Sequence, residues 1–322
     1  MKMQKFIAAS CCLMAASLVS CGGGAPVAGS ALGAMTETQP HAAGGRSKQD
    51  LIYVANGNNE VTVYSYSSQQ LVGVLTQFTK PEGECVDGEG NVYITDASAN
   101  RILEFAHGGA KPIKTYDDSP DSPYACAIDP VSGNLAVAND DGSSGNIAIW
   151  SKSSGQRTTY SDSALGVFQG CAYDSNGNLL VTNGYLGYAN PSLFAWLPEG
   201  GTRLTNVKVP GPNGSRTWHY ILGIQWDGKF FVLDDGQTIY RVLLIHGQAY
   251  YVGDTELYYG SGQFGFYSSK KGFQATVVVG PGDSESSSSV YYWNYPAGGQ
   301  PVTEISHGVD WPVAVVVSLA AK

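Results

Sequence analysis

The sequence predicts an all-β fold, a six-bladed β-propeller closed by a C-terminal strand that joins the first blade. Three observations predict it: three nearly identical segments, a regular spacing between them, and two half-copies at the ends of the repeat region. The segments are Glu84–Asp96, Cys126–Asn139 and Cys171–Asn183. Each has an apolar stretch, a turn with Gly-Asn and a second apolar stretch, which together indicate two strands joined by a hairpin.

The spacing of the copies indicates the architecture. The turn residues Asn91, Asn134 and Asn178 follow one another at intervals of 43 and 44 residues. Because apolar and polar residues alternate with a period of two, such a repeat is typical of a four-stranded propeller blade rather than of a helical pair. Degenerate copies follow at Gly223–Asp234 and Phe264–Gly280, which makes five complete copies.

The two ends of the repeat region complement each other. Leu51–Asn56 matches only the second strand of the repeat, and Trp311–Ser318 matches only the first. Joining them in one sheet completes a sixth blade and leaves no free inner edge. Two long insertions, at 184–190 and 207–220, interrupt the regular pattern.

The composition agrees with a fold of strands and turns. The chain has 322 residues, of which 43% are hydrophobic, with 41 glycines and 20 tyrosines against only 4 methionines. Aromatic residues favour pleated surfaces, and glycines favour turns. The formal charge of -9 repels phosphate backbones, so nucleic acid is excluded as an expected partner.

The N-terminus has the features of an export signal. Lys2 and Lys5 precede the apolar stretch Phe6–Val19, so we expect residues 1–20 to be removed. Leu18–Cys21 resembles the lipobox of bacterial lipoproteins, which implies a lipidated Cys21 at the mature N-terminus; an ordinary secretory signal cleaved near residue 25 or 28 is the alternative. We expect 21–49 to be a flexible tether and 50–322 the propeller. The implied location is the bacterial cell envelope, periplasmic or surface-exposed, with membrane contact through the lipid anchor only.

Three cysteines remain in the expected propeller, Cys85, Cys126 and Cys171. Export permits disulfides, but an odd number leaves at least one thiol unpaired within the chain. Cys126 and Cys171 occupy equivalent repeat positions, and Cys85 lies one residue further along its strand. Since equivalent positions of neighbouring blades are expected to be too far apart to bridge, we expect buried thiols rather than a disulfide.

A family resemblance supports the fold. Asn91–Phe105 resembles an NHL repeat, and Ile52–Asn56 with Val61–Tyr64 resembles the related YVTN type. The resemblance extends over about Leu51–Leu319 and implies a six-bladed NHL-like propeller. It is specific for fold rather than for activity, because such propellers serve as enzymes, binding modules and scaffolds.

A candidate ligand site is expected at the mouth of the central channel, where the inner strands begin and loops converge. Repeat alignment places a ring of six residues there: Glu82, Tyr124, Gln169, Leu222, Phe264 and Trp311. Its aromatic side chains suit a sugar or another partly apolar ligand, although the same ring would also serve simply to plug the channel. Glu82 and Glu84 together suit general acid chemistry or a hard cation, and exposed loop acids are the plainer interpretation.

A second ring closes the second strands. Its members are Asn56, Asp96, Asn139, Asn183 and Asp234, with Gly280 breaking the series. Because these short polar residues recur in nearly every blade, we expect them to shape the following turns rather than to bind a ligand. The two insertions break the symmetry and carry further candidate ligand-binding residues: Tyr185, Tyr188, Trp218 and His219.

Two functions fit these patterns. The sequence contains no His-Glu-x-x-His, Cys-x-x-Cys or Gly-x-Ser-x-Gly motif, which favours a non-catalytic binding or scaffold propeller without a cofactor. We expect this propeller to be a monomer. Its expected partner is an envelope glycan, a peptide or a protein. The alternative is a metal-dependent hydrolase that resembles gluconolactonases. That resemblance implies a divalent cation such as calcium, held by Glu82 or Glu84 with Asn139, Asn183 and Asp234, although the Pro and aromatic residue expected after the ligating Glu are missing.

Overall fold

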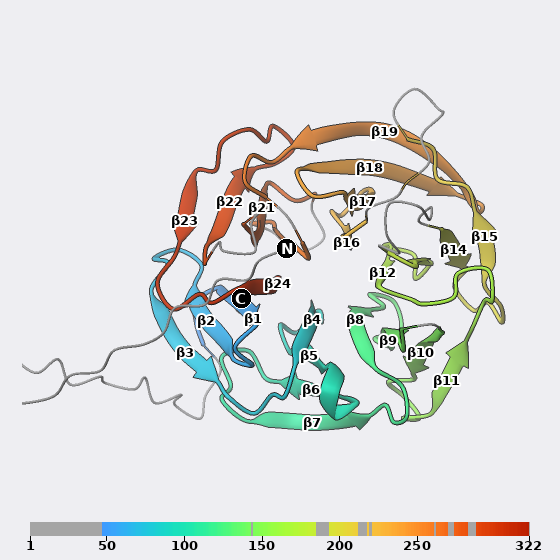
Figure 1. Ribbon diagram of the computed structural model, residues 1–322, viewed down its shortest axis with the longest axis horizontal. Helices are drawn as coiled ribbons and strands as arrows, with labels where there is room; N and C mark the ends of the chain where they lie inside the picture. Colours follow the sequence, from blue (N-terminus) through green and yellow to red (C-terminus); the bar gives the residue numbers. More distant parts are fainter. Residues whose placement is uncertain are drawn as a thin grey trace, which may run out of the picture. The chain divides into compact units, whose positions relative to one another are not determined.

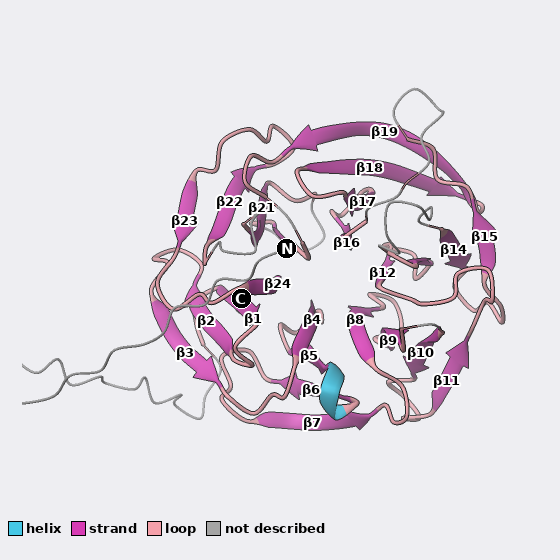
Figure 2. Ribbon diagram, in the orientation of Figure 1, coloured by secondary structure: helices cyan, strands magenta, loops and turns pink. Residues whose placement is uncertain are grey.

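The computed structural model describes residues 47–142, 144–184, 193–211, 218, 221–260, 262–269, 274–282 and 288–321. Within these ranges the chain forms six four-stranded antiparallel sheets arranged around a central axis (Figure 1). One short 3-10 helix, η1 (Ala97–Ala99), is the single helical element of the described residues (Figure 2). No helix among them has the length and apolar character needed to cross a membrane. The all-β, six-bladed architecture expected from the repeats is confirmed.

Each of the first three blades runs from an inner strand at the axis to an outer strand at the rim. Blade 1 consists of β24 (Pro312–Ser318), β1 (Leu51–Asn56), β2 (Val61–Ser65) and β3 (Leu71–Leu75). Blade 2 consists of β4 (Pro81–Val86), β5 (Val92–Asp96), β6 (Arg101–Phe105) and β7 (Pro112–Asp117). Blade 3 consists of β8 (Pro123–Ile128), β9 (Leu135–Asp140), β10 (Gly145–Trp150) and β11 (Arg157–Tyr160).

The remaining three blades follow the same order. Blade 4 consists of β12 (Gly170–Tyr173), β13 (Leu179–Thr182), β14 (Phe194–Leu197) and β15 (Thr205–Val207). Blade 5 consists of β16 (Gly223–Trp226), β17 (Phe231–Asp234), β18 (Thr238–Ile245) and β19 (Gln248–Glu256). Blade 6 consists of β20 (Gly265–Tyr267), β21 (Val277–Pro281), β22 (Val290–Asn294) and β23 (Thr303–Ile305).

The ring closes through β24, as the two half-copies predict. β24 pairs antiparallel with β1, with Leu51 opposite Ser318 and Tyr53 opposite Val316. The closing strand is also held by blade 2, because Ser318 Oγ donates to the Gly90 carbonyl at 2.6 Å and lies 2.6 Å from His107 Nδ1. With β24 in place, blade 1 has four strands like the other five described sheets, and the inner edge of β1 is paired.

The hydrophobic core is divided among the junctions between neighbouring blades. Between blades 1 and 2, for example, Tyr53 and Val316 pack with Val92, Ile94 and Phe105. Successive side chains of a strand point to opposite faces of the sheet, and the inner part of each sheet is covered on both faces by the neighbouring blades. This is why the second strand of a blade can be a nearly continuous apolar run, as in β1, where all six residues are buried.

The hairpin turns confirm the predicted repeat unit. In blade 2, Asp87 Oδ1 accepts the backbone N–H groups of Glu89 at 2.8 Å and Asn91 at 2.9 Å. In blade 4, Asp174 Oδ1 accepts those of Asn176 and Asn178 at 2.8 and 2.9 Å. The glycine of each turn has a left-handed φ of 82°, which only glycine adopts without strain.

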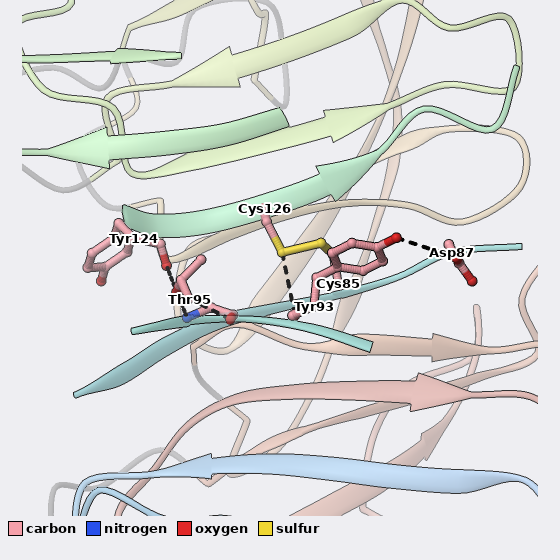
Figure 3. Close-up of a disulfide and its surroundings, with 7 residues drawn as sticks. Cys85, Asp87, Tyr93, Thr95, Tyr124 and Cys126 are labelled. Atoms are coloured by element: carbon pink, nitrogen blue, oxygen red, sulfur yellow. Dashed lines mark hydrogen bonds between the residues drawn. A yellow bond between two sulfur atoms is a disulfide. The ribbon is translucent and has the colours of Figure 1, made fainter. Parts of the chain in front are cut away.

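The expectation of unbridged cysteines is wrong for two of the three. Cys85 and Cys126 form a disulfide with a Cα–Cα distance of 5.6 Å, which joins β4 to β8 (Figure 3). The one-residue offset of Cys85 is the cause: it turns that side chain to the face of blade 2 that packs on blade 3, directly opposite Cys126. Cys171 keeps the equivalent position, faces Ala125 and Ala127 instead, and is the free, buried thiol that was expected.

Candidate functional site

The central channel is hollow where the inner strands end. A cavity of about 240 Å³ lies there, and every one of the six inner strands contributes to its wall. The lining residues are Cys85, Val86, Cys126, Ala127, Ile128, Pro130, Ala172, Tyr173, Gln225, Trp226, Gly265, Phe266, Val316 and Val317. The repeat alignment places the mouth where the inner strands begin. The larger space lies at the other end of the channel, where these strands end.

Toward the strand starts the channel narrows. A second void of only about 10 Å³, close to the volume needed for one water molecule, lies among Gln169, Gln225 and Gln263. Gln263 causes part of this constriction. Its Oε1 atom would lie 3.2 Å from a Cβ atom added to Gly83, so this blade 6 side chain reaches across to blade 2. Since Cys126 and Gln225 line both voids, the two are successive stretches of one channel.

The wall of the wide end has two unlike halves. Blades 4, 5 and 6 contribute Tyr173, Trp226 and Phe266, whereas the opposite blades contribute aliphatic side chains and the disulfide. The aromatic rings are fixed by neighbours: Trp226 contacts Phe231 edge-on at 5.0 Å between centroids, and Phe266 lies 5.0 Å from Tyr295. A planar apolar group would thus meet a preformed surface there.

At the expected mouth, the ring residues differ in availability. Phe264 is buried and packs edge-on against Phe266 at 5.2 Å. Glu82 is largely buried and pairs with Lys80. Gln169 donates from Nε2 to Asp140 Oδ2 at 2.7 Å. Two further members of the ring, Tyr124 and Leu222, are partly exposed, and the Tyr124 carbonyl accepts a hydrogen bond from Thr95 Oγ1 (Figure 3).

Trp311 is the most accessible aromatic residue of the predicted ring. It is 52% exposed, and its backbone has a φ of 52°, in the left-handed region that bulky residues rarely adopt. Its conformation is held by blade 1, because Gly57 N–H donates to the Trp311 carbonyl at 2.9 Å and Asn56 Oδ1 accepts from Asp310 N–H at 2.9 Å. A side chain at Gly57 would press on the Trp311 Cβ at 3.2 Å.

Glu84 lies away from both voids of the channel. Because it alternates with Cys85 along β4, its side chain turns to the junction with blade 1, where Tyr53 and Val316 lie. It is buried, and neither carboxyl oxygen makes a well-formed hydrogen bond with a described residue. Burial raises the pKa of Glu84 well above its ordinary value, opposed in part by the Val316 backbone N–H. Burial and this carboxyl together raise the pKa of Tyr53 to about 12.

The residues of the second ring make local hydrogen bonds, but only Asn183 and Asp234 bind the backbone that follows them, as expected. Asp96 Oδ1 accepts the backbone N–H groups of Thr79 and Lys80, at 2.9 and 2.8 Å. Asn183 Oδ1 accepts Leu193 N–H at 2.7 Å, and Asp234 Oδ1 accepts Gly236 N–H at 2.7 Å. Asn139 instead donates to Asn146 Oδ1 at 3.1 Å. Each of these four side chains thus forms a hydrogen bond with a residue near it in the fold.

The side chains that the gluconolactonase resemblance implies as cation ligands have local contacts of their own. The described residues contain no group of three or more His, Cys, Asp or Glu side chains placed to hold a metal ion. Glu84 lies in a junction between two blades, whereas Asp234 is buried at the end of β17, where burial raises its pKa well above the ordinary value. The ligands that the gluconolactonase resemblance implies are therefore held in separate local contacts.

Of the loop candidates, only Trp218 lies within the described residues. Its ring is buried, donates from Nε1 to the Val209 carbonyl at 2.9 Å and meets Tyr240 edge-on at 4.8 Å. Those contacts make it part of the core of blades 4 and 5. Tyr185, Tyr188 and His219 lie outside the described residues.

Sequence reasoning missed the residues of the wide end. Val86, Ile128, Tyr173 and Trp226 all directly precede the aspartate of a repeat turn. The alignment that placed a ring at the strand starts would also have placed this one at the strand ends. What it lacked was any indication of which end is hollow.

The fold and the channel define the protein as a six-bladed β-propeller. No family model matches the chain, and no curated protein matches it significantly. Among solved structures, a chain of a nidogen/laminin complex is similar over 85% of this chain and 99% of its own, with a TM-score of 0.63 and 14% identity. At such identities the similarity is one of fold alone.

Two further structures show the same similarity. A functionally unknown protein from Desulfotomaculum acetoxidans covers 85% of this chain and 100% of its own, with a TM-score of 0.59 and 11% identity. The β-propeller domain of Cps50 (Swd1) from Myceliophteria thermophila covers 84% and 88%, with a TM-score of 0.55 and 9% identity. These structures agree with the propeller fold and leave the activity of this chain open.

Proposed function

We propose that the protein is an exported, lipid-anchored binding or scaffold propeller of the bacterial cell envelope. Its partner would be a carbohydrate, a peptide or a protein that contacts the face where the inner strands begin. The observation that carries the binding role is Trp311, a large ring that is 52% exposed although its backbone adopts a left-handed conformation. Strained, exposed aromatic residues of this kind concentrate at recognition surfaces, because folding alone gives no reason to keep them.

The Cys85–Cys126 disulfide supports export. Structural disulfides persist in oxidising compartments and are rare in the reducing cytosol. This bond lies in the interior between two blades rather than on an exposed loop. It is therefore consistent with the basic and apolar N-terminal segment and with the lipobox-like sequence that ends at Cys21.

The binding role is tested by screening wild type and Trp311→Ala against an array of envelope glycans and peptides. The matched control is Ile113→Ala, which truncates a 58% exposed apolar side chain on the outer strand of blade 2. We expect Trp311→Ala to weaken binding by about tenfold or more, as for an aromatic interface residue, and Ile113→Ala to bind like wild type. Equal binding by both variants, or no binding by wild type, would contradict the proposal.

Lipid anchoring has its own test. In a bacterial host the wild-type chain should incorporate labelled palmitate and sediment with membranes. Cys21→Ser should lose the label and release the protein in soluble form, because no other feature of the sequence supplies acyl chains. Cys171→Ser is the control, since its buried thiol is not a lipidation site. Retention of the label by Cys21→Ser would refute lipidation at this residue.

A further inference from the structure

The channel carries chemistry that the proposed function does not use. Its two voids are adjacent, since both are lined by Cys126 and Gln225. The narrow stretch contains three glutamine side chains, and the wide stretch contains three aromatic ones. One end of the channel is thus suited to hydrogen bonding, and the other is suited to apolar packing.

The polar end offers groups that are available to a ligand. Gln169 is already bound to Asp140. Gln225 and Gln263, in contrast, form no side-chain hydrogen bond with any residue that the structure describes, and both line the narrow void. Each carboxamide provides two N–H donors and one carbonyl acceptor. Such groups in a confined space favour a ligand that supplies matching donors and acceptors.

The charge of the lining restricts the ligand. Among the described residues that line the two voids, none is Asp, Glu, Lys, Arg or His. Aspartates directly follow several lining residues, but their oxygens bind turn N–H groups, as Asp174 does with Asn176 and Asp227 does with Lys229. An ionised ligand would therefore lose its hydration in the channel without gaining an opposite charge. An anion would also be repelled by the net charge of -9.

We propose that the channel is a binding site for a compact, uncharged molecule with a planar apolar body and one amide-like or hydroxyl end. The polar end meets Gln225 and Gln263, and the apolar body lies against Tyr173, Trp226 and Phe266. The volume of about 240 Å³ admits a fused pair of rings with a short substituent. The aromatic part of this site is at the other end of the channel from Trp311, and the proposal goes beyond the proposed function.

A charge series of one shape tests this proposal. Indole-3-acetamide is neutral, indole-3-acetate is an anion and tryptamine is a cation at neutral pH, yet all three have nearly the same size. Each would be titrated into the full mature chain by calorimetry. We expect one site per chain for indole-3-acetamide, with a dissociation constant at least about tenfold lower than for either charged compound.

Variants locate the site. Gln225→Met keeps the length of the side chain and removes the carboxamide, and we expect it to weaken indole-3-acetamide binding by at least about fivefold. Gln263→Met is a second, independent variant should the first fail to fold, as judged by its thermal midpoint. Gln70→Met makes the same change at an exposed position of blade 1 and should bind like wild type.

Three results would overturn the proposal. They are the absence of saturable indole-3-acetamide binding, equal or tighter binding of a charged analogue, and wild-type affinity in every correctly folded channel variant. The glycan and peptide array reports on Trp311 at the opposite face. A failure of either proposal is therefore distinguishable from a failure of the other.

Discussion

Glu84 has a carboxyl group that is buried in a place where its ionised form is unfavourable. The residue follows Gly83 on β4 and is enclosed by the junction of blades 1 and 2, where neither oxygen has a well-formed hydrogen bond from a described residue. Ionisation there would place a negative charge among apolar side chains such as Val316. The neutral form is thus favoured in the folded chain, while the unfolded chain ionises normally.

We expect stability to depend on pH through this residue. The pKa of Glu84 in the fold is raised above its ordinary value of 4.5, so its contribution to stability is fully present below pH 4.5 and is lost as the pH rises through the raised value. Glu84→Gln removes the ionisation and should flatten that fall. At neutral pH it should raise the free energy of unfolding by roughly 1 kcal/mol or more.

Urea denaturation between pH 4 and 8 measures the effect. Burial also raises the pKa of Asp118, to about 7, so the difference between wild type and variant isolates the Glu84 contribution. Glu89→Gln, an exposed change in the same blade, is the control. Parallel pH profiles for wild type and Glu84→Gln would show that ionisation of this carboxyl does not govern the pH dependence.

At the scale of elements, the junction of blades 2 and 3 differs from the others. It contains the disulfide between β4 and β8, and it also has a very close backbone approach. A Cβ atom on Gly83 would collide with the Tyr124 carbonyl oxygen and would lie 2.7 Å from the Ala125 Cα. The two inner strands are thus joined covalently and packed without room for a side chain.

Removing the disulfide should destabilise the propeller. The double variant Cys85→Ser/Cys126→Ser opens a link between residues 41 positions apart, and we expect a loss of about 2 to 4 kcal/mol in the free energy of unfolding. Chemical denaturation with and without a phosphine reductant measures it. Reductant should lower wild-type stability and leave the double variant unchanged; sensitivity of both would assign the effect to something other than this bond.

Gly83→Ala should also destabilise the chain. The new methyl group meets backbone atoms that cannot rotate away, so β4 and β8 must separate, at roughly 1 to 3 kcal/mol. Gly73→Ala is a matched control in an outer strand, where the nearest atom is the Val63 Cβ at 3.9 Å. Thermal midpoints of both variants test this, and equal midpoints would mean that the inner strands yield without strain.

At the scale of the whole molecule, ring closure depends on β24. Deleting residues 312–321 should expose the inner edge of β1 and remove Val315 and Val317 from the core between blades 6 and 1. We expect the truncated chain to aggregate or to lose its cooperative unfolding transition, as followed by light scattering and circular dichroism. A monomeric, cooperatively unfolding product would show that five intact blades suffice.

The sequence predicted the fold better than the site, for a physical reason. A blade is a local unit, so the turn at Asn91 and its equivalents reveal it, and the unmatched halves near Leu51 and Trp311 reveal closure. The shape of the channel instead depends on contacts between blades. The contact of Gln263 with Gly83 follows from how the blades pack, and the pairing of Cys85 with Cys126 follows from a register shift of one residue. A pattern common to all repeats does not show either of these differences between blades.

The pairing of β24 with β1 also means that the starting point of the chain is arbitrary for the architecture. Ala320 N–H donates to Asp50 Oδ1 at 2.9 Å, so a short linker could connect the two ends of the ring. A circular permutant that begins at Pro81 and ends at Leu75 would contain all four strands of blade 1 in continuous order. The pairing of β24 with β1 would then be an ordinary hairpin. An N-terminal tether would start between blades 1 and 2 in such a permutant, without a change in any blade.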